Sequence, residues 1–266
     1  MGGSVNVTSN EKLLSDFADR FLGYGSLNGK VWLIGPEPGG GYTPDDVCCR
    51  ASVWADRGRK ETEDLYAYHA DLKRELEALK LRSDFDWTRR VQPTWGPLIR
   101  VILTVKDNKR EVDTEDVRTF QATELGRPDG GNGVLELLPF SSPTQSDWRL
   151  STLGIDWLRT REEYEQHCVP MRCNLLRGKV AKYRPCLVLF YGNGVEQQRR
   201  WIKISGVPFT PSKKVGQLLL AHAEKTLFVI MPHPVNLNTR LPDKGPGAVK
   251  RFLADVGATL REELRS

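Results

Sequence analysis

Residues 30–42 read KVWLIGPEPGGGY, and this stretch decides the fold that we expect. The mainly apolar run Lys30–Ile34 has the length of a strand, and Gly35-Pro36 stops it. Three similar runs follow along the chain: Val134–Leu138 (VLELL), Cys186–Tyr191 (CLVLFY) and Thr226–Met231 (TLFVIM). Short, continuously apolar strands are typical of a parallel sheet that is covered on both faces.

Helical patterns occur before, between and after these four strands. We expect helices in Asn10–Phe21, Glu61–Leu81, Thr94–Val105, Arg161–Lys182, Val195–Ile202 and Ala248–Leu264. The alternation predicts one α/β domain over residues 1–266, with a central four-stranded, mostly parallel sheet flanked by helices. In open α/β sheets, ligands bind beyond the carboxyl ends of the strands. The site should therefore lie in the four loops that follow the strands.

Composition and charge narrow the function only slightly. Lys and Arg number 39 against 34 Asp and Glu, which gives a net charge of +5. This excess is compatible with a polyanionic partner such as DNA. No apolar run is long enough to cross a bilayer, and the start MGGSVNVTSNEK lacks the pattern of a secretory signal, so we expect a cytoplasmic protein without a membrane partner.

The five cysteines are expected to be free thiols, because an odd number in a chain without an export signal argues against a disulfide framework. The alternative is an iron–sulfur cluster held by Cys168, Cys173, Cys186 and either Cys48 or Cys49. We otherwise expect no cofactor and no metal.

The loop after the first strand places a carboxylate between two prolines. Pro36 and Pro38 hold Glu37 stiffly, since each ring fixes its own backbone and restricts its neighbour. Gly39, Gly40 and the glycine after them allow backbone N–H groups to approach a ligand. We therefore expect this loop to bind substrate through Gly35, Pro36, Pro38, Gly39, Gly40 and Tyr42. The alternative is a tight turn with one exposed glutamate.

The loop after the last strand contains His233, one of four histidines. It stands between Pro232 and Pro234, directly after the strand, and a polar segment follows it. An isolated histidine is more often structural than catalytic. Its position at a strand end, in a sheet that also presents Glu37, favours a catalytic role.

The two middle loops offer further binding groups. After the second strand, Phe140 could stack on a base, and the hydroxyls of Ser141 and Ser142 could contact a base or a phosphate. Glu136 lies inside that apolar strand, so its carboxylate either points out of the core or reaches the site. After the third strand, Asn193 lies in a glycine turn that could bind an anion or could be a simple turn.

The two outer motifs together resemble the uracil-DNA glycosylase superfamily. In that family, Gly-x-(Asp/Asn/Glu)-Pro after a strand supplies the residue that activates water, and a His-Pro motif supplies a histidine that faces the leaving base. The resemblance assigns these roles to Glu37 and His233. It places the loop that enters DNA at Asn236–Arg240, including Leu237 and Asn238.

Two departures from the family pattern argue against strict uracil specificity. Gly39 stands where the best-known branch has a tyrosine that blocks the 5-position of the pyrimidine. Glu136-Leu137-Leu138-Pro139 stands where many members have a base-reading asparagine. A roomier pocket is implied, and GPEPGGG and MPHPVN look like the motifs of bacterial anti-phage glycosylases that remove glucosylated hydroxymethylcytosine.

The resemblance predicts a monomeric, monofunctional DNA glycosylase acting on double-stranded DNA, including modified phage DNA. Leu237 or Arg240 would fill the gap left by the flipped base. Phosphate contacts are expected from Lys213, Lys214, Arg240 and Lys244. One alternative is a repair enzyme for uracil or hydroxymethyluracil. Another is a non-catalytic DNA- or nucleotide-binding protein in which Glu37 and His233 are structural.

Overall fold

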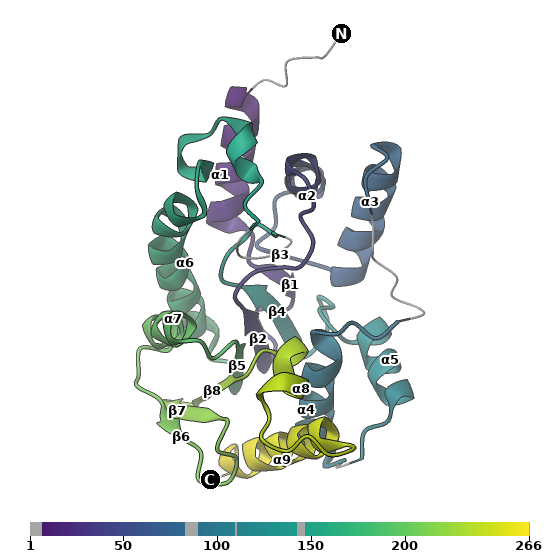
Figure 1. Ribbon diagram of the computed structural model, residues 1–266, viewed down its shortest axis with the longest axis vertical. Helices are drawn as coiled ribbons and strands as arrows, with labels where there is room; N and C mark the ends of the chain where they lie inside the picture. Colours follow the sequence, from purple (N-terminus) through teal and green to yellow (C-terminus); the bar gives the residue numbers. More distant parts are fainter. Residues whose placement is uncertain (1–6, 83–89, 110, 143–146, 266) are drawn as a thin grey trace.

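The computed structural model describes residues 7–82, 90–109, 111–142 and 147–265. These residues form one mixed sheet of eight strands, in the order β3-β1-β4-β2-β5-β8-β7-β6, with helices on both sides (Figure 1). The predicted α/β class is confirmed, whereas the predicted size of the sheet is wrong.

The centre of the sheet consists of the four predicted strands. They are β4 (Asn132–Glu136), β2 (Val31–Gly35), β5 (Leu187–Tyr191) and β8 (Thr226–Met231), and each is parallel to its neighbour. All but the first residue of β2 are buried in these strands, which accounts for their continuous apolar sequence.

Four further strands extend the sheet at both edges. β1 (Gly23–Gly25) is antiparallel to β4, and β3 (Thr62–Glu63) is parallel to β1. On the other edge, β7 (Leu219–Ala223) is antiparallel to β8, and β6 (Thr210–Pro211) is antiparallel to β7. Three of these strands have only two or three residues, so they are too short to leave a pattern in the sequence.

Nine α-helices occur in the described ranges. They are α1 (Val7–Arg20), α2 (Pro44–Asp56), α3 (Leu65–Ala78), α4 (Trp95–Asp107), α5 (Thr114–Thr123), α6 (Arg161–Tyr183), α7 (Val195–Ser205), α8 (Leu237–Arg240) and α9 (Ala248–Glu263). α6 and α7 lie on one side of the sheet, and α4, α5 and α9 lie on the other (Figure 1). None of the described helices combines the length and the apolar character that a membrane span requires.

Three of these helices, α2, α5 and the four-residue α8, were not expected. α2 starts after Thr43, whose hydroxyl accepts a hydrogen bond from the amide of Asp46, and Pro44 is its first residue. α5 starts with a capping box formed by Asp113 and Asp116. Both starts are visible in the sequence as capping motifs, and they outweigh the weak apolar periodicity of these segments.

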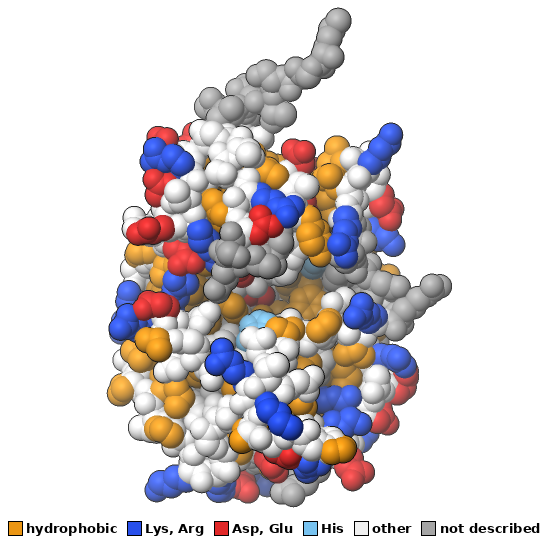
Figure 2. Space-filling model, in the orientation of Figure 1, with side chains coloured by type: hydrophobic (Ala, Val, Ile, Leu, Met, Phe, Trp, Pro, Cys, Tyr) orange, Lys and Arg blue, Asp and Glu red, His pale blue; other side chains and the backbone are white. Residues whose placement is uncertain are grey.

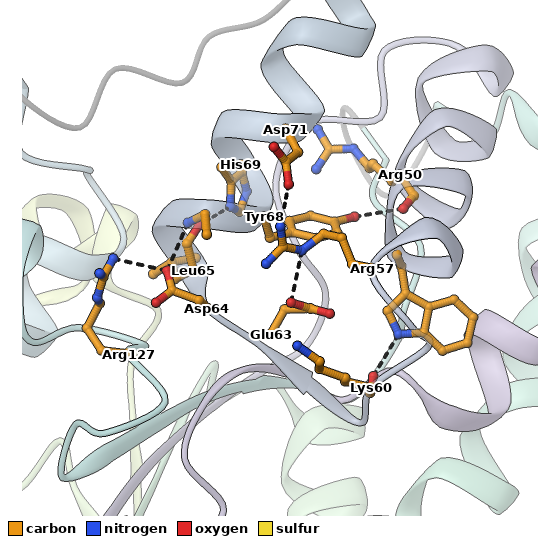
Figure 3. A network of polar contacts seen from close by, with 12 residues as sticks. Arg50, Arg57, Lys60, Glu63, Asp64, Leu65, Tyr68, His69, Asp71 and Arg127 are labelled. Carbon is orange, nitrogen blue, oxygen red and sulfur yellow. Dashed lines mark hydrogen bonds and ion pairs between the residues drawn. The ribbon is translucent and has the colours of Figure 1, made fainter.

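A polar network ties the end of α2 to β3 and α3 (Figure 3). Arg57 forms ion pairs with Glu63, at 3.0 Å, and with Asp71. The Tyr68 hydroxyl donates to the carbonyl of Arg50 at 2.9 Å. These contacts hold α2 in place. The first turn of α2, through Asp46, holds the glycine loop (Gly39–Tyr42) of the candidate site.

Candidate functional site

The parallel register brings the ends of the central strands to one edge of the sheet. Gly35 of β2 is paired with Glu136 of β4, and Tyr191 of β5 with Met231 of β8. After β2 the chain forms β3 and then β4 on one side of β2 in the sheet. It then crosses to the other side of β2 and forms β5. Such a change of direction is where open α/β sheets bind ligands.

A hydrogen bond crosses over Gly35 at this edge. The Tyr191 hydroxyl donates to Glu136 Oε1 at 3.0 Å, so the side chains of the two outer strands meet over the middle strand. A Cβ atom at Gly35 would lie 2.2 Å from Tyr191 Oη and 2.3 Å from Glu136 Oε2. The structure thus gives Gly35, a predicted substrate contact, a different role, which is to leave room for this bond.

Glu136 is buried at the end of β4. Burial raises the pKa of its carboxyl group to about 8; the hydrogen bond from Tyr191 opposes this shift, and the charge of Glu37 adds to it. The group is therefore largely protonated at pH 7. Its Oε2 atom has no hydrogen-bond partner among the described residues.

His233 follows β8 and packs next to this pair. Its ring lies edge-on to Tyr191, with 5.5 Å between the ring centroids. Burial lowers the pKa of the imidazole, so the ring is neutral at pH 7. Nδ1 is buried and has no partner within the described part of the chain.

Glu37 is held by α6 and by the loop after β4. Its Oε2 atom forms an ion pair with Arg161 at 2.6 Å, and Ser142 Oγ donates to Oε1 at 3.4 Å. The side chain is only 14% exposed, so the alternative of an exposed turn glutamate is wrong. Burial raises the pKa of the carboxyl group, although Arg161 and Ser142 oppose the shift.

Arg161 was not among the predicted site residues. It is the first residue of α6, directly after the capping residue Thr160. A cation is unfavourable at the N-terminus of a helix. That mismatch was a sequence signal that the side chain has a partner elsewhere.

Glu136, Tyr191 and His233 form a contiguous row along the edge of the sheet. Glu37 is near enough to Glu136 for its charge to raise the pKa of the Glu136 carboxyl group. Tyr191 contacts both Glu136 and His233. Figure 2 shows a hollow near the middle of this face of the molecule, with hydrophobic side chains in it and a histidine at its margin.

The glycine loop is only partly available to a ligand. The amides of Gly41 and Tyr42 donate to Asp46 Oδ2 at 3.1 and 3.2 Å, so they are already satisfied. Gly40 has a positive φ of 99°, and a Cβ there would meet Arg50. Gly39 is exposed, and a Cβ there would meet nothing within 4 Å. Pro36 and Pro38 are partly buried on either side of Glu37.

Phe140 has a different role from the predicted one. It is 1% exposed, and its ring is stacked with Tyr164 and Phe17 at centroid distances of 5.5 and 6.1 Å. In this conformation the ring is part of the core and is not available to a base. The neighbouring Ser141 is buried, and its Oγ has no partner among the described residues.

Two further parts of the predicted site are Asn193, after β5, and the rest of the loop after β4. The carbonyl of Asn193 accepts from Gln198 Nε2 at 2.7 Å, while the residue is partly exposed at the start of α7. Residues 143–146 of the second loop lie outside the described residues.

The loop after β8 differs most from the predicted DNA contacts. Leu237 is 1% exposed and packs in the core, so it is not a wedge in this conformation. The exposed apolar side chain of this loop is that of Val235, which is 51% exposed. Asn236, Asn238 and Arg240 are exposed.

The predicted phosphate-binding lysines are dispersed. Lys244 Nζ donates to the carbonyls of Asn238 and Thr239, at 3.0 and 2.8 Å, and so supports α8. Lys213 and Lys214 are exposed on the connection between β6 and β7, at the outer edge of the sheet, and Lys214 is ion-paired with Glu262 of α9.

The cysteines proposed for a cluster are not assembled. In the described ranges, no three His, Cys, Asp or Glu side chains are grouped as a metal ion would require. Cys48 and Cys49 instead line a cavity of about 310 Å³ between α1, α2 and the residues after α3, away from the strand ends.

The sequence matches no protein-family model, and it matches no curated protein.

Proposed function

We propose that the chain is a monofunctional DNA glycosylase with a uracil-DNA-glycosylase-like fold. It hydrolyses the N-glycosidic bond of a flipped-out modified pyrimidine and leaves an abasic site. One observation supports this most: Glu37 and His233, which are far apart in sequence, follow strands of the same parallel sheet, where His233 contacts Tyr191 of the Glu136–Tyr191 pair and Glu37 is near enough for its charge to act on Glu136.

Glu37 acts on the sugar. Cleavage of the bond develops positive charge on the sugar, which a nearby carboxylate stabilises, and the same group can orient the attacking water. Because Glu37 is largely shielded from solvent, its charge acts more strongly than it would in water.

His233 acts on the leaving base. Negative charge develops on the base as the bond breaks, and a neutral imidazole can donate a hydrogen bond to a base oxygen. A preorganised donor of this kind typically contributes on the order of 10²–10³ in rate. The residue as a whole is partly exposed, and within the described residues no protein group occupies its Nδ1 atom.

The open space at Gly39 favours a pyrimidine that is enlarged at carbon 5. No atom of the described residues lies within 4 Å of a Cβ built at this position, so a substituent on the base has free space next to Gly39. Glucosylated hydroxymethylcytosine of phage DNA is the substrate that we propose. The protonated carboxyl of Glu136 offers both a donor and an acceptor to the edge of the base.

Duplex DNA is the proposed partner, bound by a monomer. Val235 replaces Leu237 as the proposed wedge, because it is the exposed apolar residue of the loop after β8. The exposed side chains of Asn236, Asn238 and Arg240 lie beside it and are proposed to contact the DNA backbone.

Base release tests the proposal directly. The protein is incubated with plain, uracil-containing and glucosylated phage DNA, and abasic sites are detected by alkaline strand cleavage. Glucosylated DNA should be cleaved most. Glu37→Gln and His233→Ala should each lower base release at least about tenfold, while His222→Ala, at an exposed site beside Glu263, should not.

Two results would separate the alternatives. Preferential cleavage of uracil-containing DNA would favour the repair enzyme. Binding of DNA without abasic sites on any of the three substrates would favour the non-catalytic protein, and full activity of both Glu37→Gln and His233→Ala would remove the roles assigned to these residues.

A further inference from the structure

Every part of the Arg161 guanidinium is engaged. Nη2 contacts Glu37 Oε2 at 2.6 Å, Nη1 donates to Ser142 Oγ at 3.2 Å, and Nε donates to Glu165 Oε1 at 2.8 Å. Ser142 also donates to Glu37, so the carboxylate, the hydroxyl and the guanidinium form a closed ring of contacts. A planar group held at three nitrogens has one orientation.

Aromatic rings fix the same group from the side. The guanidinium carbon of Arg161 lies 5.5 Å from the ring centroid of Trp148 and 5.7 Å from that of Tyr164. These two rings are stacked on each other at 4.8 Å, and Tyr164 is fully buried. Both contacts are within the range of a cation–π interaction, which is stronger where water is excluded.

The charges alternate outward from Glu37. Arg161 is paired with Glu165 as well as Glu37, and Glu165 is in turn paired with Arg200 of α7. Arg161 and Arg200 are 16% and 17% exposed and Glu165 between them is 27% exposed, so the chain of ion pairs is largely shielded from solvent. Glu165 therefore orients Arg161 before any substrate binds.

The titratable groups facing Glu37 come from two elements. Glu136 faces it from β4, and Arg161, Glu165 and Tyr164 face it from α6. Within the described residues, Arg161 is the cation in contact with this carboxylate. Without it, burial and the nearby acidic groups would all favour the protonated form of Glu37.

We propose that Arg161 is a positioning residue that keeps the Glu37 carboxylate ionised and points it at the reacting sugar. This inference rests on the proposed glycosylase function and deepens it. Its placement at the first position of α6 opposes the helix dipole, and Glu37 compensates for that unfavourable position. The carboxylate is then charged and oriented before DNA enters the site.

The test uses three variants of the full chain. Arg161→Gln removes the charge, and Arg161→Lys keeps the charge but lacks the planar fork. Arg159→Gln is the matched control, since Arg159 lies two residues away in an exposed ion pair with Glu163. The titration of Glu37 is followed by NMR of carboxyl carbons without DNA, with Glu37→Gln used to assign the signal, and base release is measured against pH under single-turnover conditions.

Arg161→Gln should raise the pKa of Glu37 and move the acid limb of the pH–rate profile to higher pH. The acid limb should move by about one pH unit or more, because an opposite charge at this distance typically changes a proton affinity about tenfold or more, so base release at pH 6 should fall relative to base release at pH 8. Arg161→Lys should leave the titration of Glu37 near that of the wild type but still lower the rate, and Arg159→Gln should change neither.

An unchanged Glu37 titration in folded Arg161→Gln would overturn the inference. If that variant does not fold, a wild-type rate in Arg161→Lys would overturn it instead, because orientation by the planar fork would then be unnecessary. The proposed function fails separately, if the wild-type protein releases no base from any DNA. The titration still decides whether Arg161 controls the charge of Glu37.

Discussion

Replacement of Gly35 by alanine probes the edge of the sheet where the site is built. The added Cβ atom would lie 2.2 Å from Tyr191 Oη, 2.3 Å from Tyr191 Cζ and 2.3 Å from Glu136 Oε2. Ordinary contacts begin near 3.4 Å, so these atoms would have to move by about 1 Å. That movement breaks the 3.0 Å hydrogen bond between Tyr191 and Glu136.

The expected loss of stability follows from two costs. Overpacking of a core position costs about 1–3 kcal/mol, and leaving a buried hydrogen-bonding group without its partner costs about 1–3 kcal/mol. Replacement of glycine also restricts the unfolded chain, which offsets about 0.4–1 kcal/mol. The net fall in the free energy of unfolding should be about 1–5.5 kcal/mol.

Urea unfolding at pH 7 measures this loss, and Gly39→Ala is the control. Gly39 is exposed, and a Cβ there meets no described atom within 4 Å, so its free energy of unfolding should stay the same or rise by up to about 1 kcal/mol. Tyr191→Phe removes the hydroxyl from the clash, so its effect and that of Gly35→Ala should be less than additive in the double variant.

Equal stability of the Gly35→Ala and Gly39→Ala proteins would refute this reasoning. It would mean that the strand ends are loose enough to absorb a methyl group, and that Glu136 and Tyr191 are not held together by the packing at Gly35.

Two further predictions concern the exposed loop after β8 and the buried acid of β4. Val235→Ala should leave urea unfolding unchanged and reduce base release from double-stranded DNA more than from single-stranded DNA, whereas Leu237→Ala should cost about 2–5 kcal/mol of stability; equal effects of the two on unfolding would contradict this. Glu136 has a pKa of about 8 in the folded protein against an ordinary value of 4.5. Between these pH values the folded state keeps a proton that the unfolded state releases, so stability should fall with rising pH by up to about 1.4 kcal/mol per pH unit. Urea midpoints between pH 5 and 8 should show this slope in the wild type and a shallower one in Glu136→Gln, and parallel slopes would contradict it.

The centre of the fold could be predicted because burial on both faces leaves a strong signal. β2, β5 and β8 are apolar over nearly their whole length, and parallel strands of this kind have few alternatives. The edges could not be predicted in the same way. β1 and β3 form through pairing with strands that are distant in sequence or too short to predict, β6 pairs with the nearby β7, and the two or three residues of each carry no periodicity.

The strand-end rule located Glu37 and His233, because backbone restriction by proline and position after a core strand are both visible in the sequence. The same rule could not predict whether a side chain in these loops points into the core or toward the site. Phe140 and Leu237 follow the same strands but turn into the core, and Arg161 reaches the site from the start of a helix that is distant in sequence. Such differences depend on which partners the folded chain brings near, so they appear only in three dimensions.

The bond that passes over Gly35 also constrains how this protein can change over generations. A mutation that gives position 35 a side chain causes a clash with both the acid of β4 and the phenol of β5. A mutation of either partner leaves the other buried without its hydrogen bond. Neutral drift at any one of the three is therefore blocked, and a successful descendant has to replace them in concert. Among proteins that share this ancestry, a bulky residue at 35 should be found only where the acid–phenol pair has already been lost.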